Sequence, residues 1–318
     1  METSHESVLL EDAVVHLNIK PTDIVVDGTI GGAGHFRAML ENLDARGTLI
    51  GFDADGDAIE RGRAALANTP TRARVEFAHD NFRNIIPVLD GLNIPTIDKA
   101  LFDLGWSSFH LSSGRGFSFK ASEPLLMTYG EPEQGKTAAD LVNSAPEETL
   151  ADIFFTYGEE RFARPIARSI VRARKQATIL TTDDLVAAVL AGTPVWYQHR
   201  KLHPATKVFQ ALRIAVNDEL GALREGLGGA MERLSIGGRI AVITFHSIED
   251  RIVKTMFRDA AHAGHGVLIT RKPIIPSSRE ATRNPRARSA KLRVFEAART
   301  VSHAPNVSIR SNNLYSYL

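Results

Sequence analysis

The stretch DIVVDGTIGGAGHF, residues 23–36, decides how the rest of the sequence is interpreted. Its β-branched run at residues 24–26 is typical of a strand buried on both faces of a parallel sheet. Asp27 ends that strand, and four glycines then fall within the seven residues 28–34. Glycine lets backbone amides approach a ligand closely, and residues 36–40 are expected to form a helix whose N-terminus faces that ligand. The stretch therefore predicts a strand, a ligand-binding turn and a helix.

Three more strands are predicted along the chain, and each ends in polar or acidic residues. They are expected at residues 48–52, 75–78 and 99–102. Asp53 follows the first of them, about 20 residues after the glycine turn, where a carboxylate accepts hydrogen bonds from ribose hydroxyls. Asp103 follows the third. Because open α/β sheets bind ligands at the carboxyl ends of their strands, these side chains are expected to line a cofactor site.

The glycine pattern discriminates between two classes of cofactor. A dinucleotide-binding turn reads G-x-G-x-x-G, whereas this chain reads D-G-x-x-G-G-x-G from Asp27. A carboxylate is a poor neighbour for a pyrophosphate but suits a sulfonium or an α-amino group. The pattern therefore favours S-adenosylmethionine over NAD. A glycine turn without any ligand is disfavoured by the acidic strand ends.

Composition sets outer limits on the function. The chain has 318 residues, of which 43% are hydrophobic and 24% charged, as in an ordinary globular protein. It contains no cysteine, which excludes disulfides, thiolate metal sites and a cysteine nucleophile. The N-terminal residues lack a signal pattern and no apolar run is long enough to span a membrane, so a cytoplasmic protein is expected.

No metal site is predicted. His199 and His203 have a spacing that suits a metal on a helix, but no third ligand is evident and Pro204 follows directly. His246 stands at the end of a predicted strand. It is interpreted as a hydrogen-bonded structural residue rather than a catalytic one.

A net charge of +1 conceals two basic segments. Residues 161–213 contain ten Lys or Arg against two acids, and residues 271–299 contain nine against two. Either segment alone fits a solvated surface. Together, on a nearly neutral protein, they favour a polyanionic partner such as nucleic acid.

The order of elements predicts a seven-stranded sheet with a helical insertion after the fourth strand. Residues 106–134 are expected to form a loop over the cofactor site. Helices are then expected at residues 137–143, 146–157, 160–175 and 182–190, the last capped by Thr181 or Thr182. A long helix at 204–234 precedes a buried strand at 239–245. The closing strands, 266–270 and 292–296, are expected to pair antiparallel on either side of a basic stretch too rich in proline for regular structure.

Seven motifs give the chain a resemblance to a known family. They are DGTIGGAGH (27–35), DLGWSS (103–108), GRGFSF (114–119), YGEERFAR (157–164), HPATKVFQALRIAVNDEL (203–220), FHSIEDRIVK (245–254) and NPRARSAKLR (284–293). In these motifs, which span nearly the whole chain, it resembles the bacterial RsmH (MraW) family, which methylates N4 of a cytidine in the decoding region of small-subunit (16S) ribosomal RNA.

The resemblance implies an α/β fold, a Rossmann-like seven-stranded methyltransferase that uses S-adenosylmethionine and carries an all-helical inserted domain. The implied ranges are 1–110 and 204–318 for the methyltransferase domain and 111–203 for the insert, which helps to bind RNA. The implied partner is ribosomal RNA within the small ribosomal subunit. The sequence does not set the oligomeric state, and a homodimer is one option.

The resemblance also implies residues for the cofactor site. Contacts are implied at Gly31, Ala33, Gly34, His35, Asp53, Phe82, Asp103 and His110. Asp53 would hold the ribose and Phe82 would lie against the adenine. His110 is a departure, because the family usually has Gln there, and Trp106 and Phe109 replace the common Val and Pro.

Two further departures leave an alternative function open. Residues 124–129 read PLLMTY where the family typically reads PLDMRM, so Leu126 and Thr128 replace an acid and a base. The first interpretation is a ribosomal RNA methyltransferase. The alternative is a non-catalytic, cofactor-binding RNA or ribosome-assembly factor. A Rossmann oxidoreductase comes third because its glycine pattern differs.

Asp103 is the candidate catalytic residue. The N4 amine of cytosine is a poor nucleophile because its lone pair is delocalised into the ring, and an acceptor that holds its N–H can turn the lone pair toward the methyl group and take the proton. Asp103 is equally interpreted as an anchor for the cofactor or the loop.

The target cytidine must be unpaired or flipped out, and Trp106 or Phe109 would either stack on it or pack in the core. Predicted phosphate contacts are Arg115, Lys207, Arg286 and Arg288, each of which can equally be a surface charge.

Overall fold

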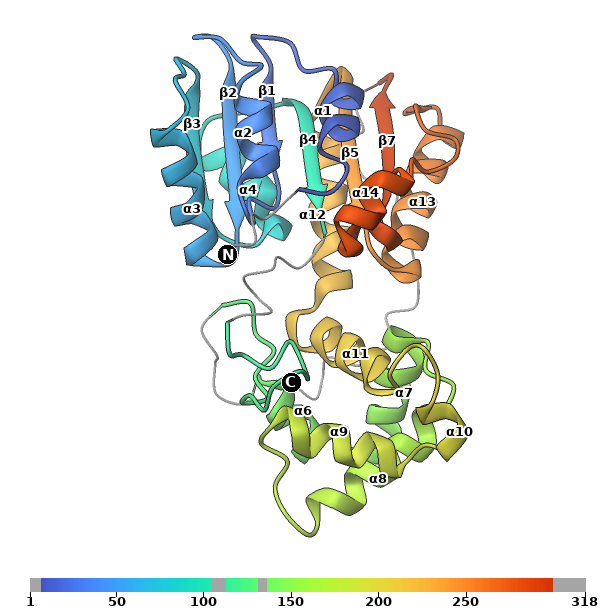
Figure 1. Cartoon of the computed structure of the whole chain (residues 1–318). Coiled ribbons are helices and arrows are strands. Elements are labelled where there is room, and N and C mark those ends of the chain that lie inside the picture. The colour runs from blue at the N-terminus through green and yellow to red at the C-terminus, as the bar shows by residue number, and fades with distance from the viewer. Residues whose placement is uncertain (1–6, 105–112, 131–135, 300–318) are drawn as a thin grey trace. The chain divides into compact units, whose positions relative to one another are not determined.

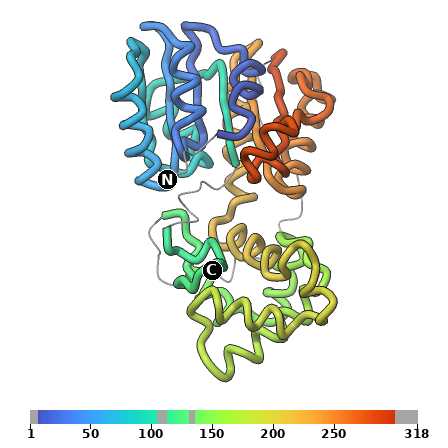
Figure 2. Tube along the Cα trace, in the orientation of Figure 1, coloured from blue at the N-terminus to red at the C-terminus, as the bar shows by residue number. Residues whose placement is uncertain are grey.

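The computed structural model describes residues 7–104, 113–130 and 136–299, and these residues fold into two compact units. The first unit contains residues 7–104 and 221–299, and the second contains residues 113–130 and 136–220. Figures 1 and 2 show an α/β unit, blue and orange to red, and a helical unit, green to yellow. The helical unit is inserted between the fourth and fifth strands of the α/β unit.

A mixed sheet forms the centre of the first unit. Within the described residues it has the seven strands that were predicted, and they lie in the order β3-β2-β1-β4-β5-β7-β6 (Figure 1). They are β1 (Ile24–Asp27), β2 (Thr48–Asp53), β3 (Arg74–His79), β4 (Ile97–Asp103), β5 (Leu234–Thr244), β6 (Gly266–Leu268) and β7 (Lys291–Ala297). Strands β1 to β5 are parallel, and β7 runs antiparallel to both of its neighbours. The strand order reverses between β1 and β4, the place where such sheets bind ligands.

Helices cover both faces of this sheet. They are α1 (Leu10–Leu17), α2 (Gly34–Leu40), α3 (Gly56–Ala67), α4 (Ile85–Gly91), α12 (Glu219–Arg233), α13 (Ser247–His262) and α14 (Ser278–Arg283). Figure 1 shows α1 and α2 on one face and α4 and α12 on the other. Leu17, Phe36 and Met39 are fully buried in the core between α1, α2 and the strands. This apolar burial packs α2 against the sheet at the end of the glycine turn.

The basic stretch before β7 is more regular than predicted. It contains α14 and a 3-10 helix, Pro285–Ser289, and so the expectation of irregular structure was wrong. The Ser277 side chain caps α14, and Asn284 accepts a hydrogen bond from the N–H of Arg286 at the start of the 3-10 helix. Pro285 stands at a helix start, where its missing N–H removes no helical bond.

The helical unit consists of short helices around its own core. In the described residues they are α6 (Ala138–Ser144), α7 (Glu147–Gly158), α8 (Ala163–Arg174), α9 (Thr182–Ala191), α10 (Val195–Gln198) and α11 (Ala205–Asn217). The four helices predicted between residues 137 and 190 are confirmed, and Thr181 caps α9 in a capping box with Asp184. Phe154 and Ile166 are fully buried in the core of this unit. The short helix α10 was not predicted.

The single long helix predicted at 204–234 was wrong, because it is broken at Asp218. Asp218 has a left-handed backbone with φ 46°, and α11 ends before it while α12 begins after it. The amide of Asn217 donates to the carbonyl of Met127 and accepts from the N–H of Tyr129, which ties the end of α11 to the preceding loop. α11 therefore packs on α7, and the chain rejoins the first unit at residue 221 rather than at 204.

Among the residues that the structure describes, no helix combines the length and the apolar character that a membrane crossing needs.

Candidate cofactor and methyl-transfer site

The glycine turn between β1 and α2 is the centre of the candidate site. Gly31 and Ala33 both have left-handed backbones, with φ 50° and 61°. Gly28 is required for packing, because a Cβ there would lie 2.5 Å from the Phe102 ring. α2 begins at Gly34 without a side-chain cap. The predicted turn is thus present, with three of the predicted contact residues on it.

Asp53, at the end of β2, holds this turn from the side. Its Oδ2 accepts a hydrogen bond from the N–H of Gly31 at 2.9 Å, and its Oδ1 accepts one from the N–H of Asp55 at 2.9 Å. Burial raises the pKa of the Asp53 carboxyl, and the two backbone bonds oppose that rise. On the other side, Arg61 donates to the carbonyl of Gly31 at 2.8 Å. The predicted partners Gly31 and Asp53 are therefore brought together.

Asp27, at the end of β1, is fully buried beneath the turn. Its Oδ1 accepts the N–H of Thr29 at 3.1 Å, whereas its Oδ2 has no hydrogen-bond partner within the described part of the chain. Burial raises the pKa of Asp27 to about 7, the bond from Thr29 opposes the rise, and the charges of Asp103 and Asp53 add to it. The glycine pattern predicted Asp27 beside a sulfonium or an α-amino group, although Asp27 was not among the contacts that the family resemblance implies.

Asp103, at the end of β4, lies beside His35 of α2. The His35 ring is buried, and its Nε2 donates to the carbonyl of Val8 at 3.1 Å. Its Nδ1 lies 3.5 Å from Oδ2 of Asp103. The backbone N–H of Asp103 also donates to Oγ1 of Thr29 at 2.8 Å, so the end of β4 is tied to the glycine turn. The structure thus joins two residues that the sequence separates by more than sixty positions.

Phe82 lies after β3, at the start of the 3-10 helix Phe82–Asn84. Its ring packs edge to face on Phe102, with 5.4 Å between centroids. Gly226 of α12 leaves room for this ring, since a Cβ there would collide with it. The half-buried ring therefore has a fixed position in the same unit as the turn, and its contact with an adenine stays a prediction.

A cavity of about 370 Å³ borders the turn between α2 and α3. Its lining residues are Gly32, Ala33, Gly34, Arg37, Arg61, Ala64, Ala65 and Asn68. Asp27, Asp53 and Asp103, the acids at the ends of β1, β2 and β4, do not line this cavity. It therefore adjoins the turn without containing the acidic groups that the cofactor prediction invokes.

The predicted phosphate contacts are divided between the two units. In the helical unit, Arg115 donates to the carbonyl of Tyr129 at 2.7 Å, and Lys207 donates to the carbonyl of Glu159 at 2.7 Å, at the end of α7. In the α/β unit, Arg286 and Arg288 are exposed on the 3-10 helix before β7. Arg115 and Lys207 thus have structural hydrogen bonds, and so does Arg288, whose Nε donates to the carbonyl of Ala281 at 3.2 Å. Partial burial lowers the pKa of the Arg286 guanidinium. Trp106, Phe109 and His110 lie outside the described residues.

The segment with the two departures, residues 124–129, is held by its backbone. Leu126 accepts a hydrogen bond at its carbonyl from the N–H of Ala138, at 2.8 Å. Met127 has a left-handed backbone with φ 58° and donates to the carbonyl of Arg115 at 2.7 Å. Thr128 is buried, and its hydroxyl has no hydrogen-bond partner among the described residues. Backbone hydrogen bonds at residues 126 and 127 therefore tie this segment to Ala138 and Arg115.

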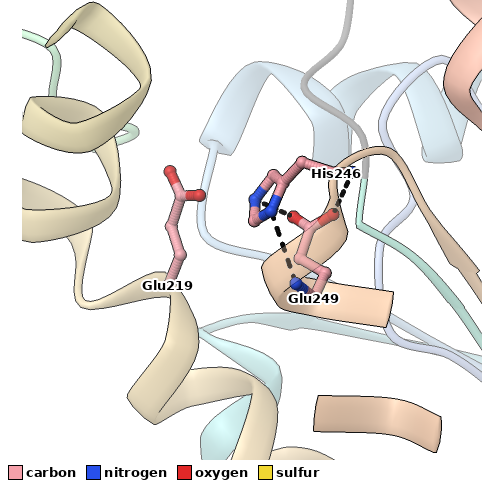
Figure 3. Close-up of side chains that lie close together, drawn as sticks. All are labelled: Glu219, His246 and Glu249. Atoms are coloured by element: carbon pink, nitrogen blue, oxygen red, sulfur yellow. Dashed lines mark hydrogen bonds and ion pairs between the residues drawn. The ribbon is translucent and has the colours of Figure 1, made fainter. Parts of the chain in front are cut away.

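His246 caps helix α13, in agreement with its structural interpretation (Figure 3). Its Nδ1 accepts the N–H of Glu249 at 3.3 Å, and Oε2 of Glu249 accepts the N–H of His246 at 3.2 Å. Glu219, also drawn in Figure 3, belongs to the helical unit. There its carboxylate binds Arg213 at 2.7 Å and the hydroxyl of Tyr129 at 2.8 Å.

The sheet, its antiparallel seventh strand and the acid-preceded glycine turn define a Rossmann-like methyltransferase. The comparison with known families agrees with this class. The chain belongs to the MraW methylase family, whose model matches residues 2–298.

Curated relatives match the chain over nearly its whole length. One from Carboxydothermus hydrogenoformans is 45% identical over 93% of this chain and 98% of its own, and one from Streptococcus pyogenes is 43% identical over 94% and 99%. Both are named ribosomal RNA small subunit methyltransferase H. A solved rRNA methylase from Streptococcus thermophilus is 12% identical, with a TM-score of 0.41 over 91% of this chain and 93% of that one.

Proposed function

We propose that this protein transfers the methyl group of S-adenosylmethionine to N4 of a cytidine in the decoding region of small-subunit ribosomal RNA. Family membership and the two relatives support the reaction and the RNA. The observation that carries the cofactor is the buried Oδ2 of Asp27, which has no hydrogen-bond partner in the described residues. A buried carboxylate oxygen of this kind fits a ligand that brings positive charge.

The residues at the strand ends fit the parts of that cofactor. Asp53 would bind the ribose hydroxyls, Phe82 would lie against the adenine, and the backbone from Gly31 to His35 would pass the methionine moiety. His110 would add a contact, as the resemblance implies. The bound cofactor supplies a methyl group on a positively charged sulfur. Asp27 and Asp103, at the ends of the adjacent strands β1 and β4, would stabilise that charge.

Asp103 would act on the substrate nitrogen. One of its carboxylate oxygens accepts an N–H of the cytosine amine, which turns the nitrogen lone pair toward the methyl carbon. The same carboxylate would take the proton that N4 loses when it is methylated. His35 holds that carboxylate from its other side. The remaining rate gain comes from in-line positioning.

The substrate proposal places RNA contacts on both units. Arg286 and Arg288 would bind phosphates on the α/β unit, and Arg115 and Lys207 would do so on the helical unit. We propose the small ribosomal subunit in the cytoplasm as the setting of the reaction. The cytidine would be unpaired or flipped when it reaches the site.

The direct test is transfer of a labelled methyl group from S-adenosylmethionine to small ribosomal subunits that lack the modification. Digestion to nucleosides should place the label on N4 of a single cytidine. Label on another base would contradict the proposed substrate atom. If the protein binds the cofactor but labels neither subunits nor free RNA, the non-catalytic assembly factor replaces the enzyme.

A further inference from the structure

An aromatic cluster on the helical unit has no part in the proposed methyl transfer. It consists of Phe162, Trp196 and Tyr197, which we call the aromatic platform. Phe162 lies at the start of α8, and the other two residues lie on α10. The rings pack edge to face, with centroid distances of 4.7 Å for Phe162–Tyr197, 5.7 Å for Trp196–Tyr197 and 5.9 Å for Phe162–Trp196. The platform is thus a single packed group.

A buried carboxylate fixes this platform from below. Glu160 has no exposed surface, its Oε2 accepts the hydroxyl of Tyr197 at 2.8 Å, and its Oε1 accepts the N–H of Phe162 at 2.8 Å. Burial, and then the bond to Glu160, raise the pKa of Tyr197 to about 12, so the phenol keeps its proton and continues to donate. A buried carboxylate is costly unless it is hydrogen-bonded. Here its bonds hold two of the three aromatic residues.

The third ring remains open to solvent. Trp196 is 55% exposed although the rings beside it are packed. The guanidinium of Arg161 lies 4.9 Å from the Phe162 ring centre and 5.2 Å from that of Trp196. Arg200 lies 5.6 Å from the ring centre of Tyr197. The surface therefore presents an indole flanked by cations on a rigid support.

The charge around the platform decides which partner fits. Residues 159–164 and 195–201 supply all of its rings and both of its arginines. The exposed charged residues in these two segments are Arg161, Arg164, Arg200, Lys201 and Glu159. Four cations against one acid favour a polyanion, and an exposed indole offers a face on which any base can stack.

We propose that the aromatic platform binds an unpaired nucleotide of RNA, with its base stacked on Trp196 and the adjoining phosphates bound by Arg161 and Arg200. This inference rests on the proposed function, which supplies the RNA. The inference goes beyond the proposed function because it assigns a second RNA contact, on residues that are not among the predicted phosphate contacts. A stacked base of this kind strengthens binding by about fivefold to a hundredfold.

The test measures binding of the full-length protein to fluorescent single-stranded RNA of about ten nucleotides, a length that suits a site of this size. We expect Trp196→Ala to weaken binding by about fivefold or more. Trp196→Phe keeps an aromatic face and should restore most of the affinity. Val195→Ala is the matched control, because Val195 is 69% exposed on the same helix and has no ring.

An abasic oligomer of the same length separates stacking from charge. Trp196→Ala should bind it as well as the unaltered protein does, whereas Arg161→Ala should weaken binding to both oligomers. Equal affinity of Trp196→Ala and the unaltered protein for the base-containing RNA would overturn the inference. An equal loss of affinity for the base-containing and the abasic oligomer would also overturn it. A loss of affinity that appears only with assembled subunits would overturn it too, and would indicate a protein partner.

Failure of this inference can be told apart from failure of the proposed function. If the unaltered protein labels cytidine N4 and Trp196→Ala binds RNA normally, only the platform is refuted. If the unaltered protein binds S-adenosylmethionine but neither binds nor methylates RNA, the proposed function fails first. S-adenosylmethionine affinity, which Trp196→Ala should leave unchanged, reports on the α/β unit, and circular dichroism of each variant checks that the helical unit is folded.

Discussion

His35 and Asp103 meet with Nδ1 of the imidazole 3.5 Å from Oδ2 of the carboxylate. The opposite ring nitrogen, Nε2, donates to the carbonyl of Val8, which can only accept. Nδ1 therefore faces a carboxylate, and this contact is attractive only when a proton lies on the nitrogen or on the carboxyl group. The residue proposed to take a proton from the substrate is thus held by a second group that can carry one.

Replacing His35 should slow methyl transfer. We expect His35→Gln to lower the single-turnover rate by about tenfold or more, because Asp103 loses the partner that holds its carboxylate. His262→Gln, which changes an exposed histidine at the end of α13, is the control and should leave the rate unchanged. Measuring the rate at saturating cofactor separates this effect from weaker binding. A rate equal to that of the unaltered protein would show that His35 only packs.

Asp27 should make the fold less stable as pH rises. Its pKa is raised from 3.8 to about 7 in the folded protein, so the folded state holds a proton that the unfolded state releases. The contribution of Asp27 to the free energy of unfolding is therefore highest below about pH 4. It falls as pH rises to 7, by on the order of 4 kcal/mol at most. Asp27→Asn should remove this fall.

Urea unfolding at pH 5 and pH 8 measures whether the stability of the protein falls as pH rises. Asp27→Asn should gain stability over the unaltered protein at pH 8 and gain less at pH 5. Asp152→Asn removes an exposed carboxyl of the helical unit and should show no such difference. A variant that is less stable at pH 8 would contradict the account of a buried, unpartnered carboxylate.

The same substitution should weaken the cofactor in a charge-dependent way. If Asp27 faces positive charge on the ligand, Asp27→Asn should reduce affinity for S-adenosylmethionine by about tenfold, the effect of roughly 1.4 kcal/mol. Affinity for S-adenosylhomocysteine, which lacks the positive sulfur, should fall less. Calorimetric titration with both ligands at pH 8 measures the two losses. Equal losses would assign Asp27 to some other part of the ligand.

Gly28 should be intolerant of any side chain. A Cβ at this position would lie 2.5 Å from the ring of Phe102, which is fully buried and cannot move freely. Gly28→Ala should therefore cost about 1–3 kcal/mol in unfolding free energy. Gly91→Ala meets nothing within 4 Å and should change stability far less. Thermal melts of both variants give the comparison, and equal melting temperatures would refute the packing argument.

The sequence predicted the parts of the site that depend on strand ends. Residues at the carboxyl ends of parallel strands meet at one edge, so Asp27, Asp53 and Asp103 converge although they are far apart in the chain. The alternation of strands and helices likewise predicted the sheet. These features depend on local patterns, which a single sequence contains.

Other features depend on contacts that no local pattern encodes. The helix break at Asp218 follows the hydrogen bonds of Asn217 to the distant loop at 127–129. The raised pKa of Asp27 follows from its burial, and the cluster around Glu160 joins two segments more than thirty residues apart. Lys207 was predicted from its charge alone, and that charge does not reveal its bond to Glu159.

Asp103 is proposed to take the proton from the substrate amine at a site that binds S-adenosylmethionine. The most direct measurement is the single-turnover rate of methyl transfer to undermethylated small subunits for Asp103→Asn, with S-adenosylmethionine affinity measured alongside. We expect the rate to fall at least about a hundredfold, with cofactor affinity changed far less. A variant that binds the cofactor weakly but transfers at the normal rate once saturated would contradict it, and would leave Asp103 as an anchor for the cofactor.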